Sequence, residues 1–147
     1  MMRHRLVIIG FLLWAGLAWA GPPLPANTTS GGMSPNDIGS EEVVTVRIHA
    51  RKFIPPMVQL HAGHKTRLVL KNEDAELHAF VPGDLFNGVS LNVGGNGAPM
   101  FGDLGLRKVI IPGEGQAELR FVLRQPGQYP YLCDMPGHEM NGTIVVE

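Results

Sequence analysis

Alternating hydrophobic and polar residues, the pattern typical of half-buried β-strands, recur along the chain from residue 44 onward. Residues 44–49 alternate strictly, and residues 67–71 and 118–124 repeat the pattern. Five shorter segments complete a set of about eight predicted strands: residues 57–61, 77–81, 108–111, 128–133 and 143–146. Turn-forming Pro and Gly residues separate the segments, and none shows the 3.6-residue spacing of a long amphipathic helix. The pattern predicts an all-β chain folded as a sandwich or barrel.

Residues 83–105 interrupt this pattern. They contain seven glycines, little alternation and the cluster Gly94-Gly95-Asn96-Gly97. We expect a long loop here, with a short helix or an extra hairpin as the alternatives. Loops beyond ~12–15 residues are uncommon in compact domains and often functional.

The N-terminal segment has the features of an export signal. Arg3 and Arg5 form a basic start, residues 6–19 are mostly apolar, and Ala18-Trp19-Ala20 offers an A-x-A cleavage site. We therefore predict a signal peptide at residues 1–20 and an exported protein, periplasmic or extracellular. A membrane anchor is the alternative, but the run is shorter than the ~20 apolar residues that span a bilayer. No stable membrane insertion is expected after cleavage.

The remaining chain divides by composition into two parts. Residues 21–40 are rich in Gly, Pro, Ser, Thr and Asn without apolar periodicity, which predicts a flexible linker. Residues 41–147 then form one domain, of ordinary size for a single hydrophobic core. Removing residues 1–20 changes the formal net charge from −1 to −3. Because the basic residues are also scattered, nucleic acid is not an expected partner.

The only cysteine, Cys133, lies in a short segment with other potential metal ligands. It is followed by Met135, His138 and Met140. A lone thiol in an oxidising compartment needs shielding, which burial or metal ligation provides. A thiolate, an imidazole and a thioether, joined by a second imidazole, would make the His₂Cys set with a weak axial sulfur that suits electron-transfer copper. The segment therefore indicates a metal site.

Four further histidines outside the signal segment are candidates for the second imidazole. His49 falls on the polar face of its predicted strand, so we expect it to be exposed. His61 and His64 flank a turn and are either exposed polar residues or a surface metal site. His78 follows a polar turn and leads into a strand; together with the Cys133 segment, ligation is favoured over a structural role.

Two segments of the chain resemble the cupredoxins, the small blue-copper proteins. They are residues 63–74 followed by His78, and residues 127–138 with the sequence Gly-Gln-Tyr-Pro-Tyr-Leu-Cys-Asp-Met-Pro-Gly-His. The resemblance covers residues 43–146. It implies a Greek-key β-sandwich and one copper ion that alternates between Cu(I) and Cu(II). It also implies that His78, Cys133 and His138 are ligands, with the Pro136-Gly137 turn bringing sulfur and imidazole together.

The chain departs from the family at the fourth ligand. Familiar members with this Cys-to-His spacing place the axial methionine four or five residues beyond the histidine, whereas Met140 is two residues beyond His138. We expect Met140 as the axial ligand, with Glu139, Met100 or no protein ligand as alternatives. Met135 is expected at an apolar rim. A carboxylate or water at this position would favour Cu(II), and an open position would admit a small molecule.

The resemblance implies a one-electron carrier rather than an enzyme. Redox proteins, as donor and acceptor, would dock transiently at an exposed edge of His138, framed by Met135 and Pro136. One alternative is a copper-binding or copper-handling protein that uses His61, His64 and methionines as transfer ligands. Another is a cupredoxin-like copper site with an open or carboxylate axial position that binds a small molecule. A nucleophilic enzyme with a Cys133–His138 dyad is disfavoured, because the sequence offers no identifiable orienting residue.

Overall fold

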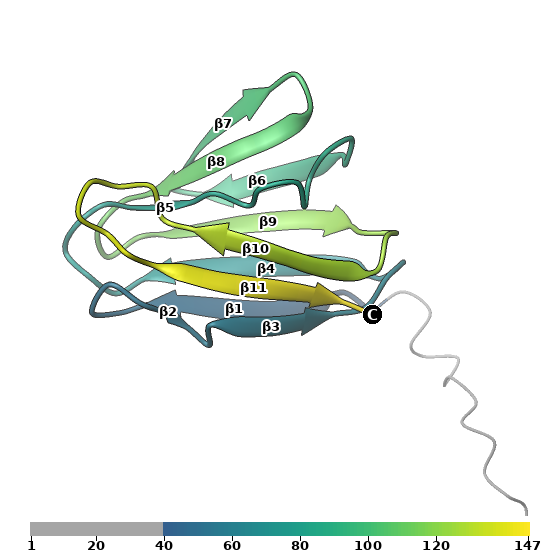
Figure 1. Cartoon of the computed structure of the whole chain (residues 1–147), viewed down its shortest axis with the longest axis horizontal. Helices are drawn as coiled ribbons and strands as arrows, with labels where there is room; N and C mark the ends of the chain where they lie inside the picture. The colour runs from purple at the N-terminus through teal and green to yellow at the C-terminus, as the bar shows by residue number, and fades with distance from the viewer. Residues whose placement is uncertain (1–39) are drawn as a thin grey trace, which may run out of the picture. The chain divides into compact units, whose positions relative to one another are not determined.

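The computed structural model describes residues 40–147, which form strands, turns and loops (Figure 1). The predicted signal peptide and all but the last residue of the predicted linker lie outside the described residues. The strands are β1 Glu42–Ile48, β2 Phe53–Ile54, β3 Met57–Leu60, β4 Lys65–Asn72, β5 His78–Phe80, β6 Leu91–Gly95, β7 Ala98–Gly102, β8 Gly105–Ile111, β9 Gln116–Val122, β10 Gly127–Leu132 and β11 Asn141–Val146. Within residues 40–147, no helix has the length and apolar character needed to cross a membrane.

One layer of the fold is a five-stranded sheet in the order β2-β1-β4-β9-β6. Strands β1 and β4 run parallel, while β9 is antiparallel to β4. Because side chains alternate along a strand, the register that pairs Val46 with Leu70 places their side chains on one face, and both are buried. The predicted alternation in residues 44–49, 67–71 and 118–124 thus marks the inner face of this sheet.

The second layer consists of two three-stranded sheets, β5-β8-β7 and β10-β11-β3. An antiparallel bridge between Val81 and Leu132 joins them through two backbone hydrogen bonds, with N to O distances of 2.9 and 3.1 Å. This bridge places the chain just after β5 beside the end of β10. His78 begins β5 and Cys133 follows β10, so the layer brings two predicted ligands together.

The apolar core lies on the inner faces of the two layers. Its largest fully buried side chains include Phe80, Phe86, Ile48 and Leu119. Phe86 packs edge-to-face on Phe121 with ring centroids 4.9 Å apart. Each such side chain contributes about 1.5–3 kcal/mol on removal from water. A continuous core of this kind gives the rigid support that a preformed metal site requires.

The predicted all-β sandwich is confirmed, and each of the eight predicted strands overlaps an observed one. The prediction of a long loop at residues 83–105 was wrong, because this stretch contains β6 and β7. Strand β6 pairs with β9, and β7 pairs with β8. Every residue of β7 is exposed. In β6 only Leu91 and Val93 pack against the core, and they are followed by glycines, so the alternation was too short to reveal the strand. Strand β7 has no buried face to produce alternation.

Candidate metal centre

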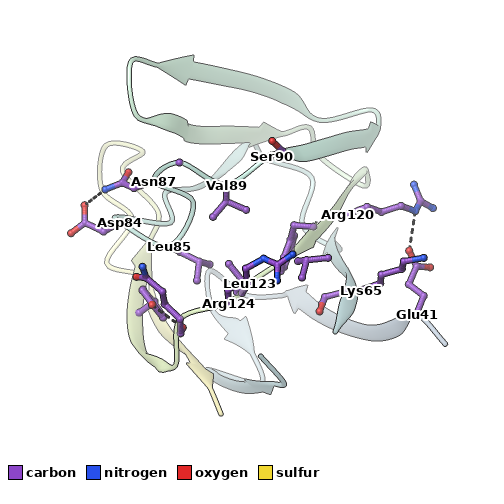
Figure 2. Close-up of a pocket in the computed structure, with 16 residues that line it drawn as sticks. Glu41, Lys65, Asp84, Leu85, Asn87, Val89, Ser90, Arg120, Leu123 and Arg124 are labelled. Carbon is purple, nitrogen blue, oxygen red and sulfur yellow. Dashed lines mark hydrogen bonds and ion pairs between the residues drawn. The ribbon is translucent and has the colours of Figure 1, made fainter. Parts of the chain in front are cut away.

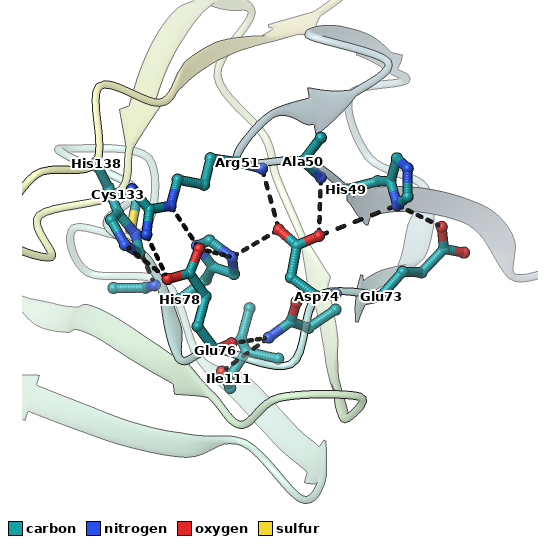
Figure 3. A network of polar contacts seen from close by, with 12 residues as sticks. His49, Ala50, Arg51, Glu73, Asp74, Glu76, His78, Ile111, Cys133 and His138 are labelled. Carbon is teal, nitrogen blue, oxygen red and sulfur yellow. Dashed lines mark hydrogen bonds and ion pairs between the residues drawn. The ribbon is translucent and has the colours of Figure 1, made fainter.

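His78, Cys133 and His138 meet at one end of the sandwich. His78 is the first residue of β5, Cys133 directly follows β10, and His138 lies in the loop before β11. Their potential ligand atoms all lie within 4.8 Å of one another. Figure 3 shows the three side chains converging beside an acidic segment that includes Asp74 and Glu76. The fold therefore brings together the three residues that the sequence predicted as ligands.

The Cys133 thiol is buried and oriented by its surroundings. The Ala79 N–H donates to its Sγ atom at 3.3 Å, and His138 Nδ1 lies 3.5 Å from the same sulfur. The backbone N–H of Cys133 donates to the carbonyl oxygen of Met140 at 3.0 Å, which closes the loop. These contacts hold the sulfur at a fixed position facing His138, and sulfur is a soft ligand that suits copper or zinc.

A tight turn sets the position of His138. Its N–H donates to the Met135 carbonyl oxygen at 3.0 Å, with Pro136 and Gly137 between them. Gly137 has a φ of +77°, which fits the third position of a type II turn, where glycine is favoured and proline commonly precedes it. The Pro136-Gly137 turn was expected from the sequence, and it returns the imidazole toward the sulfur.

His78 is fully buried and has one free ring nitrogen. Its Nε2 atom is hydrogen-bonded to Asp74 Oδ2 at 3.0 Å, whereas its Nδ1 atom is buried and has no hydrogen-bond partner among residues 40–147. A neutral imidazole that donates from Nε2 to a carboxylate carries a lone pair on Nδ1. Leaving such a buried atom unpaired costs about 1–3 kcal/mol. Metal ligation through Nδ1 would remove this cost, so the residue fits a metal ligand.

Asp74 links His78 to the turn between β1 and β2. Its carboxylate accepts hydrogen bonds from the backbone N–H groups of Ala50, at 2.8 Å, and Arg51, at 3.0 Å. These residues have positive φ values of 51° and 55°, conformations that are uncommon for residues with a side chain. Burial acts to raise the pKa of Asp74, but hydrogen bonds from Arg51, Ala50 and His78 together hold it below its ordinary 3.8. The carboxylate therefore orients His78 and holds an unfavourable turn.

A second carboxylate covers His138. Glu76 Oε2 lies 3.6 Å from His138 Nε2, and the Arg51 guanidinium binds the same carboxylate with contacts of 2.5 and 2.7 Å. The hydrogen bond from Arg51 is the main reason that the pKa of Glu76 lies below its ordinary 4.5. The His138 side chain is only 6% exposed. It is therefore more enclosed than the exposed edge that the resemblance implies.

Asn72 holds the backbone of this acidic segment from inside the core. It is buried, and its amide donates to the carbonyl oxygens of Glu76, at 2.8 Å, and Pro112, at 2.9 Å. Its side-chain oxygen accepts the Asp74 N–H at 3.0 Å. Three backbone groups of the segment and its neighbour thus depend on one side chain.

Replacing Asn72 with alanine should lower the free energy of unfolding of the apoprotein by about 2–4 kcal/mol, because buried backbone groups lose their partners. Urea denaturation measures the change. The matched variant Asn92→Ala removes an exposed asparagine from β6 and should stay within about 0.5 kcal/mol of the native protein. Equal stabilities of the two variants would contradict this role of Asn72.

The two lowered carboxylate pKa values predict an acid-sensitive fold. Because the folded-state pKa values of Asp74 and Glu76 lie below their ordinary 3.8 and 4.5, the stability they contribute is present above those ordinary values. This contribution to stability is lost as the pH falls below 3.8 and 4.5 and through the lower folded-state pKa values of the two carboxylates. Urea denaturation of the apoprotein from pH 6 to 3 should show this loss. Arg51→Ala should flatten the decline, because Glu76 loses its main stabilising partner, whereas the control Arg47→Ala should not. A decline that is identical in all three proteins would contradict the assignment.

The candidates for the fourth ligand differ in burial. Met140 is buried in the core cluster directly before β11. Glu139 is exposed, and Met100 lies half-exposed on β7. Met135 is partly buried against the core, as expected for an apolar rim. Burial thus favours Met140 among the candidates that the sequence offered.

The other predicted histidines are not members of this trio, although His49 Nδ1 lies 4.0 Å from Asp74 Oδ1. His49 is exposed, as its place on the polar face predicted. His61 and His64 lie together with Glu42 at the turn between β3 and β4. Sequence reasoning missed Asp74 and Arg51 as supports of the centre. An acidic residue four positions before a buried histidine was a usable signal for Asp74, whereas no local signal pointed to Arg51.

Figure 2 shows the residues that line a cavity of about 1030 Å³. Its lining includes Leu85, Val89 and Leu123 beside charged residues, and it shares no residue with the His78–Cys133–His138 trio. On its rim, Arg120 pairs with Glu41 at 3.3 Å.

Comparison with known proteins identifies relatives of this architecture. The structure of auracyanin A, a "blue" copper protein from the green thermophilic photosynthetic bacterium Chloroflexus aurantiacus, matches with a TM-score of 0.55 and 18% identity, over 74% of this chain and 100% of that one. Auracyanin B matches with a TM-score of 0.51 and 22% identity, over 72% and 88%. At these identities the likeness shows the fold alone. Comparison with curated protein sequences found no match. The family model of the cupredoxin-like domain matches residues 12–146, and the chain therefore belongs to the cupredoxin family.

Proposed function

We propose that the chain is an exported one-electron carrier that holds one copper ion with His78, Cys133 and His138, and with Met140 as a weak axial ligand. The observation that carries the proposal is the buried meeting of two imidazoles and one thiol, where His78 Nδ1 has no hydrogen-bond partner in the part of the chain that the structure describes. This donor set suits copper, which supplies a Cu(I)/Cu(II) couple when bound. Membership of the cupredoxin family, the small blue-copper proteins, supports the same metal.

The residues around the trio hold the donor atoms in place before any ion binds. Asp74 fixes the ring of His78, the Ala79 N–H fixes the sulfur, and the loop hydrogen bonds fix His138. Donors held by a packed β scaffold resist rearrangement when the charge of the site changes. Such resistance favours fast electron transfer and supports a carrier over a transport role.

The enclosure of the site supports a carrier rather than an enzyme. All three proposed strong ligands and Met140 have buried or nearly buried side chains. A substrate would need an open ligand position, and burial of Met140 argues against one.

Exposed apolar residues beside the centre support docking of redox partners. Leu77, directly before His78, is 53% exposed, and Leu132, directly before Cys133, is 45% exposed. Transient redox complexes use small interfaces. We propose that a donor and an acceptor protein each bind here weakly, near the Arg51–Glu76 ion pair.

The proposed location is the periplasm or the exterior of the cell. The basic start, the apolar run and the A-x-A site within residues 1–20 support export. The burial of Cys133 supports it too, because an oxidising compartment would attack an exposed thiol.

Redox cycling of the copper-loaded protein tests the function. The purified chain, loaded with one copper per molecule, should take up and release one electron per copper through repeated cycles of ascorbate and ferricyanide without losing metal. A colourless Cu(I) protein that sheds copper on oxidation would instead support copper handling. Hydrolysis that depends on the thiol and needs no metal would support a Cys–His enzyme.

A variant of Met140 tests its proposed role as the axial ligand. Met140→Leu keeps the buried volume but removes the thioether, so we expect a shifted visible spectrum and a raised reduction potential, because a weak donor to Cu(II) is lost. Met100→Leu, at a half-exposed methionine on β7, is the control and should leave both unchanged. An unchanged spectrum in Met140→Leu would exclude Met140 as a ligand.

A further inference from the structure

A second group of potential metal ligands lies at the other end of the sandwich. Glu42 is the first residue of β1, His61 follows β3, and His64 directly precedes β4. Strand β1 has seven residues and runs from Glu42 toward the turn that Asp74 holds. At ~3.3 Å per residue, its two ends are roughly 20 Å apart. The second group is therefore separate from the His78–Cys133–His138 trio.

The three side chains already face one another. Potential ligand atoms of Glu42, His61 and His64 lie within 4.8 Å of each other. His61 Nδ1 lies 2.8 Å from Glu42 Oε1, and the two imidazole rings stack with centroids 5.2 Å apart and planes inclined by 28°. One carboxylate from β1 and two imidazoles from the turn between β3 and β4 thus converge.

The backbone that carries the two histidines is fixed. Between them, the Ala62 N–H donates to the Glu147 carbonyl oxygen at 2.7 Å, and the Gly63 N–H donates to the Leu123 carbonyl oxygen at 2.6 Å. Gly63 has a φ of +82°, which lets the chain turn sharply enough for both rings to lie on one side. The two rings are therefore presented from a backbone that these hydrogen bonds hold in place.

The Glu42 carboxylate is also held in place. It is largely shielded, and its Oε2 atom accepts hydrogen bonds from the His61 N–H, at 3.2 Å, and the Thr66 hydroxyl, at 3.4 Å. These contacts orient Oε1 toward the histidine ring. A negative charge positioned in this way attracts a cation to the space beside the two rings.

We propose that Glu42, His61 and His64 form a second metal site, for a borderline divalent ion of the Zn(II) or Cu(II) type. Imidazole and carboxylate ligands suit these ions, and two histidines with one glutamate is a known zinc donor set that leaves positions open. The His61 side chain is 61% exposed, so the open positions face solvent. This inference goes beyond the proposed electron carrier and does not rest on it.

Zinc titration by calorimetry tests the site. The reduced protein, carrying one Cu(I) per chain under nitrogen, is titrated with Zn(II), and one zinc per chain should bind. The double variant His61→Ala/His64→Ala should bind none, and Glu42→Gln should bind at least ~10-fold more weakly. The control His49→Ala removes a histidine whose side chain is also 61% exposed, and it should bind zinc like the native protein.

Copper provides the second arm of the test. With excess Cu(II), the native protein should show an additional electron paramagnetic resonance signal with nitrogen couplings. This second copper should add no sulfur-to-copper absorption band, and its signal should be absent from the double variant. Failure of the native protein to bind zinc, or native-like zinc binding by the double variant, would overturn the proposal. If the site centred on Cys133 binds no copper, the native protein and the double variant should still differ by one zinc per chain. Failure of the proposed copper site can therefore be distinguished from failure of the second metal site.

Discussion

Replacing Cys133 with serine should abolish the intense visible absorption of the copper-loaded protein and weaken copper binding by more than ~100-fold. Serine has nearly the same shape, but its hydroxyl is neither soft nor ionised at neutral pH. The Ala79 N–H can still donate to the serine oxygen, so the fold should be retained. Equilibrium dialysis and the visible spectrum measure the two effects.

Met135→Leu is the control for this loop. Met135 lies between the two proposed ligands and packs partly against the core, so leucine should preserve both the loop and the absorption. A Cys133→Ser protein that still binds one copper tightly with an unchanged spectrum would show that the sulfur is not a ligand. Loss of the absorption in both variants would point instead to general disruption of the loop.

Replacing Asp74 with alanine should have the second-largest effect on stability and copper binding. Its carboxylate orients the proposed ligand His78 and also holds the turn after β1. The variant leaves the buried Nε2 of His78 unpaired and releases the N–H groups of Ala50 and Arg51. We expect the free energy of unfolding to fall by about 2–4 kcal/mol and copper affinity to fall about 10–100-fold. Urea denaturation of the apoprotein and competition with a copper chelator measure these changes.

Two further variants separate positioning from simple loss of charge. Asp74→Asn keeps a hydrogen-bond acceptor, so it should recover part of the copper affinity lost in Asp74→Ala. Glu73→Ala removes the neighbouring carboxylate, whose partners are exposed charged groups such as Arg47, and should cost no more than about 1 kcal/mol. If Glu73→Ala weakened copper binding as much as Asp74→Ala, the positioning role would be contradicted.

The sequence predicted those parts of the fold that depend on burial and on local spacing. Strands such as β1 and β9 were visible because one face of each packs into the core. The segment from Cys133 to His138 was visible because its ligands and turn residues are close in sequence. In contrast, β6 has only Leu91 and Val93 packed against the core, and β7 is exposed throughout, so both depend largely on backbone pairing with β9 and β8.

The surroundings of the centre depended on contacts between distant segments, which no local pattern encodes. Arg51 reaches Glu76 only because Asp74 holds the turn after β1 in an unusual conformation. The resulting cover over His138 was therefore not foreseen. The same holds for Glu42, which parallel pairing of β1 with β4 brings beside His64.

The most direct test of the central claim, that two histidines and Cys133 hold one copper ion, is the spectrum of the native protein after adding one equivalent of Cu(II). If the trio holds copper, we expect an intense visible band from sulfur-to-copper charge transfer that saturates at one copper per chain. The paramagnetic resonance signal should have the narrow copper splitting of a thiolate-bound site. A colourless protein, or a weakly absorbing one whose copper has only nitrogen and oxygen ligands, would show that Cys133 and the two histidines do not hold copper together.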